Sequence, residues 1–305
     1  MIKLENCEIM GWETAIRGMR NPMNSWVKSD SKYCSEYDHP PIKGSCQYCP
    51  YDNICNKSEK SMQQMYLVGS NDYDLMIRLR NAGTDHRKFM RMIVVYVDIT
   101  APLYWWKEFD TYKIGTVANS CSTMHKIAEK EFMLEDFSHE HLISEPYDVD
   151  NDELIDGEFE DSGLVLVVNN DNGWLGQCYH TASGNKCVEY LAPKILLDKY
   201  IISALNASRE AYLKTKDKKY WWQMIQLLPS SYNQKRTVML NYEVLANIYK
   251  SRKNHKLDEW VELCKWIESL PYSELITGLP LNDIPICNDI IKEATKRMTN
   301  EGENK

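Results

Sequence analysis

The sequence predicts a fold that mixes strands with helices, and three observations support this. Residues 92–99 form an apolar run typical of a buried strand, and Pro102 follows it where a helix over 103–113 would start. Residues 164–179 read as two short strands around the turn sequence Asn-Asn-Asp-Asn-Gly, which predicts a hairpin. After Cys187, apolar residues recur with the 3.6-residue period of helices.

Composition and charge narrow the classes of function. The chain has 305 residues, of which 43% are hydrophobic and 26% charged, as in globular proteins. Its net charge of −8, without a long basic block, argues against binding a nucleic-acid polymer through phosphates. No run approaches the roughly 18 apolar residues of a membrane span, and the N-terminal residues lack a secretory signal pattern. We therefore expect a cytoplasmic protein without a membrane partner.

The segment 28–60 is polar and holds four of the ten cysteines, at Cys34, Cys46, Cys49 and Cys55. In the cytoplasm cysteines serve as thiols or metal ligands more often than as disulfides. The C-x2-C pair at 46–49 would present two thiolates to one ion, and the other two cysteines would complete the site. Zinc fits this ligand set, an iron–sulfur cluster is the second possibility, and a loop with free thiols is the third.

Three further segments complete the first two thirds of the chain. A helix is predicted around residues 75–82, stopped by Gly83. The polar loop 114–122 follows the proline-started helix. Its backbone N–H groups and hydroxyls would either bind an anion or the edge of a ring, or form hydrogen bonds within the loop's own turns. Residues 126–161 are acidic and are interpreted as a solvated excursion. We expect insertions at about 28–60 and 135–185 in a single domain spanning 1–305.

The C-terminal part predicts three helices, at about 191–212, 220–228 and 240–270. Proline at 229 would stop the second, and the third would be the longest. Within the third, Asn241, Asn247 and Arg252 are predicted to lie near one side, beside the apolar stripe. Polar groups in such a place are either satisfied core residues or contacts to a ligand.

Two stretches resemble the flavin-dependent thymidylate synthase family. The first, ITAPLYWWKEFDTYKIGTVANSCSTM at 99–124, is similar to the family's strand, proline, helix with an Arg-His-Arg triplet, and serine-containing loop. The second, LPSSYNQKRTVMLNYEVLANIYKSRKNHKLDEW at 228–260, is similar to its Leu-Pro motif followed by a helix that carries Asn, Leu, Asn and Arg. The Cys-rich segment, the acidic segment and the hairpin have no counterpart.

The resemblance implies an α+β fold with a central mixed sheet and long helices, usually assembled as a homotetramer. It also implies FAD as the cofactor and the methylation of dUMP to dTMP, with methylenetetrahydrofolate as carbon donor and a nicotinamide-reduced flavin as hydride donor. The expected site residues follow by position: Lys113, Asn241, Asn247 and Arg252 for the cofactor, Glu108, Ser122 and Thr123 for the substrate, and Cys121 for catalysis.

Departures from the family motifs predict an altered substrate. The Arg-His-Arg triplet is replaced by Thr-Tyr-Lys at 111–113, and a glutamine just before it is replaced by Glu108. The Ser-Gly-Arg that holds dUMP becomes Cys-Ser-Thr at 121–123, so a phosphate would lose charge-assisted bonds worth roughly 1.5–3 kcal/mol each. The chain is thus expected to be a flavin-dependent nucleotide-modifying methyltransferase, or alternatively a non-catalytic nucleotide-binding or interaction protein on the same fold.

For two groups of residues in the first stretch, the sequence leaves two roles open. Cys121 would be either a reactive thiol or a buried, inert one. Tyr104, Trp105, Trp106 and Tyr112 would either wall a planar ring or pack in the core.

Overall fold

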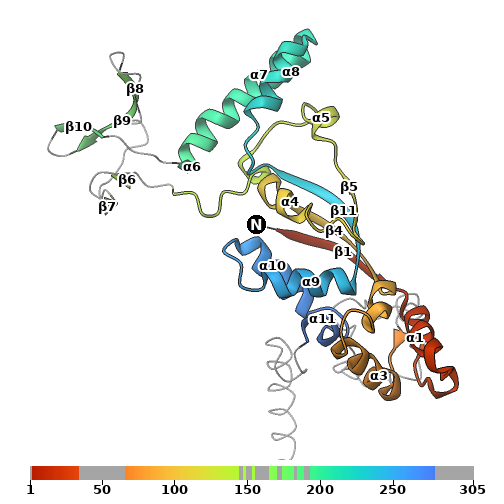
Figure 1. Cartoon of the computed structure of the whole chain (residues 1–305). Helices are drawn as coiled ribbons and strands as arrows, with labels where there is room; N and C mark the ends of the chain where they lie inside the picture. The colour runs from red at the N-terminus through yellow and green to blue at the C-terminus, as the bar shows by residue number, and fades with distance from the viewer. Residues whose placement is uncertain are drawn as a thin grey trace, which may run out of the picture. The chain divides into compact units, whose positions relative to one another are not determined.

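The computed structural model describes residues 2–33, 66–143, 147–148, 153–154, 165–169, 174–181, 184–188 and 193–278 (Figure 1). It forms two compact units: unit 1 comprises Met1–Cys121 and Gln234–Lys305, and unit 2 comprises Ser122–Asn233. The fold is α+β, as predicted. The boundaries of these two units do not coincide with the insertions expected at 28–60 and 135–185. Those insertions therefore stay a prediction.

Unit 1 is built on a four-stranded sheet in the order β1-β4-β11-β5. The elements of unit 1 in the described residues are β1 Lys3–Met10, α1 Trp12–Arg20, η1 Asn21–Met23, η2 Trp26–Lys28, β2 Lys32–Tyr33, β3 Tyr66–Leu67, α3 Ser70–Asn81, η5 Arg87–Met92, β4 Val94–Pro102, α4 Leu103–Phe109, β5 Val117–Ser120, β11 Asn233–Asn241, α9 Tyr242–Arg252, α10 Asp258–Glu268 and α11 Glu274–Thr277.

The strands of this sheet pair antiparallel, whereas the resemblance implied a mixed sheet. β1 is antiparallel to β4, and β11 is antiparallel to β5. Tyr242 donates its N–H to the carbonyl of Ile93 at 3.1 Å, and Thr237 Oγ1 donates to Asp98 Oδ1 at 2.6 Å. The end of β11 therefore lies beside the start of β4, which is an antiparallel arrangement.

Strand β4 lies inside the sheet of unit 1, and its successive side chains point to opposite faces of that sheet. Val95, Val97, Ile99 and Ala101 are buried on one face, and the residues between them are half-buried. Helices α1, α4, α9 and α10 supply many of the other buried side chains of this core, and α3, η5, β11 and α11 contribute further ones. The predicted strand at 92–99 and the helix after Pro102 are confirmed, and the helix predicted around 75–82 is α3.

Four details of these predictions are wrong. Pro102 is the N-cap of α4 instead of its first residue, and α4 ends at Phe109 instead of continuing to 113. The polar loop 114–122 contains the strand β5 because its backbone pairs with β11. The single helix predicted at 240–270 is the end of β11, then α9 and α10, separated by residues 253–257.

Unit 2 has its own small core. Its described elements are α5 Thr123–Lys126, η6 Leu134–Asp136, β6 Tyr147–Asp148, β7 Glu153–Leu154, β8 Val165–Asn169, β9 Trp174–Thr181, β10 Gly184–Val188, α6 Pro193–Ile195, the π-helical segment η7 Leu196–Ile201, α7 Ile202–Thr215 and α8 Lys218–Leu227. Helices α7 and α8 match the first two helices predicted after Cys187. Strands β8 and β9 pair antiparallel where the hairpin is predicted.

The acidic segment is not wholly a solvated excursion. Ile127, Phe132 and Phe137 are buried, and they pack with Leu205 of α7 and Met224 of α8 in the core of unit 2. The expectation that residues 126–161 are solvated is therefore wrong for residues 127–137, because the apolar side chains among them pack in the core of unit 2.

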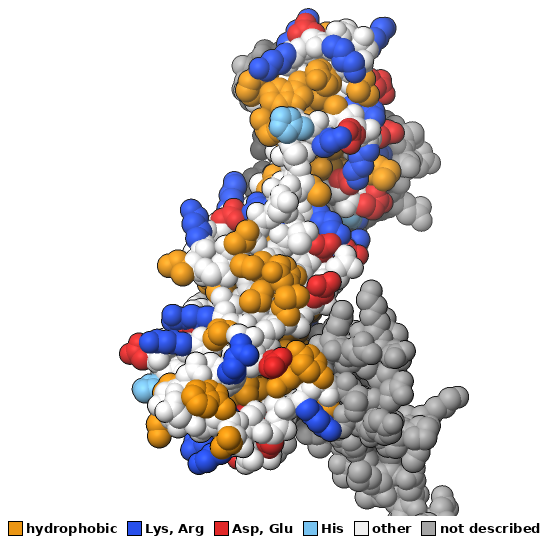
Figure 2. Space-filling view, turned by 90° about the vertical axis from the view of Figure 1, so that its right-hand side faces the viewer, with side chains coloured by type: hydrophobic (Ala, Val, Ile, Leu, Met, Phe, Trp, Pro, Cys, Tyr) orange, Lys and Arg blue, Asp and Glu red, His pale blue; other side chains and the backbone are white. Residues whose placement is uncertain are grey.

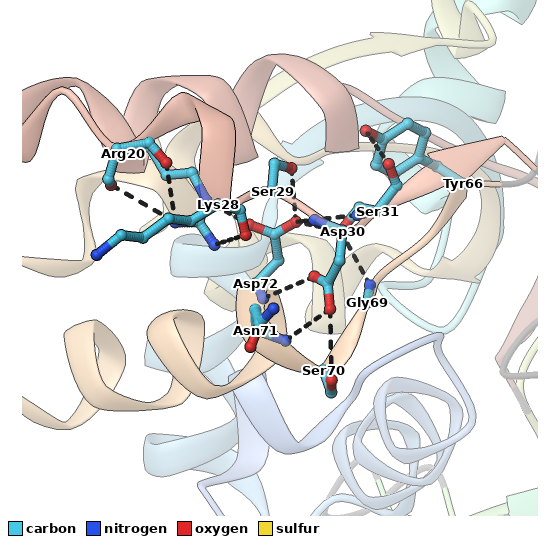
Figure 3. A network of polar contacts seen from close by, with 11 residues as sticks. Arg20, Lys28, Ser29, Asp30, Ser31, Tyr66, Gly69, Ser70, Asn71 and Asp72 are labelled. Atoms are coloured by element: carbon cyan, nitrogen blue, oxygen red, sulfur yellow. Dashed lines mark hydrogen bonds and ion pairs between the residues drawn. The ribbon is translucent and has the colours of Figure 1, made fainter.

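A buried carboxylate connects α3 to α1 and to the segment 29–31 in unit 1 (Figure 3). Asp72 Oδ1 accepts from Arg20 Nε at 2.6 Å, and Asp72 Oδ2 accepts from Ser29 Oγ at 2.7 Å and Ser31 Oγ at 2.6 Å. The backbone N–H groups of Asp30 and Ser31 also donate to Oδ2, each at 3.1 Å. Burial raises the pKa of Asp72, but the hydrogen bonds from Ser31, Ser29 and Arg20 outweigh it and hold the pKa below its usual range.

Within the described residues, no helix is long and apolar enough to cross a bilayer.

We predict that Asp72→Asn destabilises the chain by about 3–5 kcal/mol at neutral pH, because it leaves the buried Arg20 charge without its partner. The native pKa of Asp72 is lowered, so the stabilisation by its carboxylate is present above the unfolded pKa. This stabilisation is lost as the pH falls through the native pKa, so the free energies of unfolding of wild type and variant approach each other there. Urea unfolding between pH 3 and 7 measures this.

Glu129→Gln is the control, because Glu129 pairs with Lys126 on the surface, where ion pairs contribute little. An Asp72→Asn variant within about 1 kcal/mol of wild type at pH 7 would show that the network does not hold unit 1 together.

Candidate functional site

The two stretches that carry the family resemblance meet in unit 1 through an ion pair. Arg252, the last residue of α9, donates from Nη1 to Glu108 Oε2 of α4 at 2.9 Å. Its Nε donates to the Tyr112 hydroxyl at 3.0 Å, and Trp260 Nε1 donates to the same Glu108 oxygen at 2.9 Å. The structure thus brings together Glu108, predicted for the substrate, and Arg252, predicted for the cofactor.

Aromatic rings enclose the guanidinium of Arg252. Its Cζ lies 4.7 Å from the ring centroid of Trp260 and 5.8 Å from that of Tyr112, distances at which a cation is attracted to a ring face. The side chain of Arg252 is 20% exposed and that of Glu108 is 37% exposed. The pair is therefore partly shielded from water but reachable from it.

His255 lies between the two charges. Its Nε2 is 2.9 Å from Arg252 Nη1 and 3.6 Å from Glu108 Oε2, while its Nδ1 accepts from the backbone N–H of Leu257 at 3.2 Å. A neutral imidazole has one acceptor nitrogen, so it can satisfy only one of these two N–H donors. A protonated ring would instead donate from Nε2 toward Glu108. Sequence reasoning missed His255; its position three residues after Arg252 was the available signal.

Asn241 holds the start of α9 and meets the turn that carries Lys113. Its Oδ1 accepts from the Val244 N–H at 3.0 Å, which makes it a helix N-cap. Gly115 has φ of +78°, and a Cβ at Gly115 would lie 2.9 Å from Asn241 Nδ2 and 3.1 Å from Val244 Cγ2. The turn therefore needs glycine to approach α9 this closely.

The same turn holds a hydroxyl without a partner and an exposed cation. Thr116 Oγ1 is buried and makes no hydrogen bond within the described part of the chain. Such a group is costly to bury unless something else pairs with it. Lys113 is exposed three residues earlier. The turn offers one cation and one hydroxyl beside the Asn241 amide.

Asn247 does not join this cluster. At 3.6 residues per turn, Arg252 lies within about 20° of Asn241 around the helix axis, whereas Asn247 lies about 120° away. Asn247 Oδ1 accepts from Arg87 Nη2 at 3.5 Å, and Arg87 also pairs with the buried Glu243 at 3.4 Å. The prediction that Asn241, Asn247 and Arg252 share one side is therefore wrong for Asn247, which faces η5.

The tryptophan pair packs in the core. Trp105 and Trp106 are 0% and 1% exposed, and Trp105 contacts Phe109 and Trp260 at centroid distances of 5.0 and 4.8 Å. These two rings are thus not available to wall a ligand from the surface. Tyr104, which pairs with Glu259, and Tyr112 are only half-buried.

A second arginine, Arg236 of β11, was also missed by sequence reasoning. Its Cζ lies 4.1 Å from the Trp106 ring centroid, and its Nη1 donates to Asp110 Oδ1 at 2.8 Å. Arg236 Nε donates to Gln234 Oε1 at 3.0 Å. Like Arg252, it is paired with an acidic side chain beside α4.

Cys121 is exposed at the end of β5, so its expected alternative as a buried thiol is wrong. Its N–H donates to the Lys235 carbonyl at 2.9 Å. Ser122 caps α5 by accepting from the His125 N–H at 3.1 Å, and Thr123 is the first residue of α5. Both belong to unit 2, and their predicted role in substrate binding stays a prediction.

The predicted metal ligands Cys34, Cys46, Cys49 and Cys55 lie outside the described residues. Among the residues that are described, no group of three or more His, Cys, Asp or Glu side chains could hold a metal ion.

Comparison with known proteins gives a likeness to solved structures only. No protein-family model matches the chain, and no curated protein matches it. Thymidylate synthase X from Helicobacter pylori, solved with FAD and dUMP, is 14% identical with a TM-score of 0.49, covering 91% of this chain and 98% of that one. The UMP/dUMP methylase PolB from Streptomyces cacaoi, solved with 5-Br UMP, is 10% identical with a TM-score of 0.46, covering 91% and 94%.

These structures come from the family that the two sequence stretches resemble and from a methylase of UMP and dUMP. At 10–14% identity and TM-scores under 0.5, the likeness leaves the activity to be argued from the chain's own residues.

We predict that Asn241→Ala lowers the free energy of unfolding by about 1 kcal/mol, because α9 loses its N-cap. Asn241→Asp keeps an acceptor for the Val244 N–H and should stay near wild type. Chemical denaturation of the three proteins measures both effects. An Asp variant that is as unstable as the Ala variant would contradict the capping role.

Proposed function

We propose that the chain is a flavin-dependent nucleotide-modifying protein of the thymidylate synthase type, with an altered substrate. The observation that supports this most is the meeting of the two motif stretches at Glu108, Tyr112, Arg252 and Trp260, although more than a hundred residues separate them. Glu108 and Arg252, which were both chosen only by their motif positions, are thus in contact within unit 1.

The turn 113–116 offers some of the groups that would bind FAD. Thr116 Oγ1 is a buried hydroxyl with no partner in the described part of the chain, the Asn241 amide lies beside the turn, and Lys113 supplies a positive charge for a phosphate. A bound flavin would supply hydride-transfer chemistry. The role of the chain's residues would be to bind the ring edge and phosphates and to orient them.

The nucleotide would bind without the usual arginine contacts. Arg252 is paired with Glu108 and Arg236 with Asp110, so a phosphate would have to displace a carboxylate to reach either guanidinium. This supports a substrate other than dUMP. We further propose a homo-oligomer, in which a second copy covers the exposed turn.

The paired arginines also favour the second candidate, a non-catalytic nucleotide-binding protein on the same fold. The two differ in flavin content. A catalytic protein would purify yellow, with the absorbance near 450 nm of oxidised flavins, and would transfer a methyl group to a uridine or deoxyuridine nucleotide. A colourless protein that ignores added FAD would leave only the second candidate.

We predict that Thr116→Val weakens FAD binding by about threefold to tenfold, the loss expected for one hydrogen bond, without loss of stability. Valine keeps the shape of threonine, and the hydroxyl it removes has no partner among the described residues. Quenching of flavin fluorescence measures the affinity, and thermal unfolding measures the stability.

Thr111→Val is the matched control, because the Thr111 hydroxyl donates to the Glu108 carbonyl at 2.7 Å. It should lower stability slightly and leave FAD affinity unchanged. If Thr116→Val binds FAD as tightly as wild type, the turn is not part of the flavin site.

A further inference from the structure

The turn between α7 and α8 in unit 2 concentrates positive charge. Lys214, Lys216, Lys218 and Lys219 fall within six residues and are all exposed, and Asp217 is the one acidic residue among them. Asp217 caps α8 by accepting from the Lys219 N–H at 3.0 Å, and it pairs with Lys219 Nζ at 3.2 Å. The local charge is therefore opposite in sign to the chain's net −8.

Aromatic rings lie among these lysines. Lys218 Nζ is 6.0 Å from the Trp221 ring centroid and 5.6 Å from that of Trp222, and Lys219 Nζ is 4.8 Å from that of Tyr220. Trp222 is 42% exposed, whereas Trp221 is anchored by its Nε1, which donates to the Met124 carbonyl at 3.1 Å. Figure 2 shows basic and hydrophobic side chains interleaved at its upper end, where Figure 1 places the α7–α8 turn.

Polar side chains flank the exposed Trp222 on α8, and Leu227 at the end of the helix is also exposed. Lys218, Trp222 and Gln226 follow one another every four residues and so form one stripe, with the exposed Gln223 next to Trp222. A lipid surface would require the residues around Trp222 to enter an apolar layer, where glutamine amides are costly. A strand of nucleic acid offers phosphates to the lysines, a base face to the ring and base edges to the amides.

We propose that this tip surface, formed by Lys214, Lys216, Lys218, Lys219, Trp222 and Gln226, binds single-stranded nucleic acid. The lysines contact phosphates, and a base stacks on Trp222. The net charge of the chain predicts no such partner, but charges farther away than about 8–10 Å are screened at physiological salt, so the local lysines decide the sign of the interaction.

The test measures the binding of the full chain to fluorescein-labelled dT20 by fluorescence anisotropy between 50 and 200 mM NaCl. Four phosphate contacts predict that log K falls with log salt with a slope of about −3. Trp222→Ala should weaken binding about tenfold, the loss of one stacked base. Lys214→Gln with Lys216→Gln should make the slope shallower by about 1.4.

Lys126→Gln and Lys130→Gln are the matched controls, because both lysines are exposed in unit 2 and each pairs with an acidic side chain outside the tip surface. They should leave binding and slope unchanged. Circular dichroism and thermal unfolding establish that every variant is folded.

Three results would overturn the proposal: no binding of dT20 by wild type, equal loss in the tip and control variants, or binding of phosphatidylglycerol-containing vesicles without binding of dT20. A fourth contradicting result is tighter binding to duplex DNA of the same length, unaffected by Trp222→Ala, because no base would then be stacked. The tip variants should keep the FAD affinity of wild type, so this test is independent of the proposed flavin site.

Discussion

The ion pair between Glu108 and Arg252 is the interaction on which the candidate site depends. It joins α4, which follows the central strand of unit 1, to the end of α9. Trp260 of α10 donates to the same carboxylate and lies over the guanidinium, so three helices meet at one pair of charges. Removing one partner would leave the other partly buried and unpaired, which costs more than the pair itself stabilises.

This pair also decides what the site can bind. A free arginine is well suited to a phosphate, because its planar guanidinium forms two parallel hydrogen bonds. Arg252 uses Nε for Tyr112 and Nη1 for Glu108, so the guanidinium already holds a carboxylate where a phosphate would bind. The exposed Lys113 and the Thr116 hydroxyl, which has no partner among the residues that the structure describes, are then the groups left for a ligand at the neighbouring turn.

Local signals in the sequence predicted the centre of unit 1. The run 92–99, Pro102 and the aromatic residues after it gave the strand and helix because burial and proline geometry act locally. The family resemblance gave Glu108 and Arg252 as site residues but did not predict their ion pair, since no local rule connects residues this far apart. Asn241 was expected at the site, but its role as the N-cap of α9 depends on where β11 ends.

Long-range pairing explains what was missed. Apart from Val117, residues 117–120 are small or polar, and they form a strand because their backbone pairs with that of β11. In β11 only Val238 and Leu240 are buried apolar residues, and Leu240 was interpreted as the start of the helix predicted at 240–270. Ile127, Phe132 and Phe137 could not be recognised as core from an acidic segment, because α7 and α8 supply the surface they pack against.

The measurement that addresses this account most directly is the affinity of Glu108→Gln for dUMP, compared with wild type by isothermal titration calorimetry. Glutamine keeps an acceptor for Trp260 but releases the charge of Arg252. Binding of dUMP should therefore tighten by about tenfold or more, the worth of one charge-assisted hydrogen bond, and return to the wild-type value in Glu108→Gln with Arg252→Gln. If Glu108→Gln binds dUMP no more tightly than wild type, Glu108 does not hold Arg252 away from the substrate.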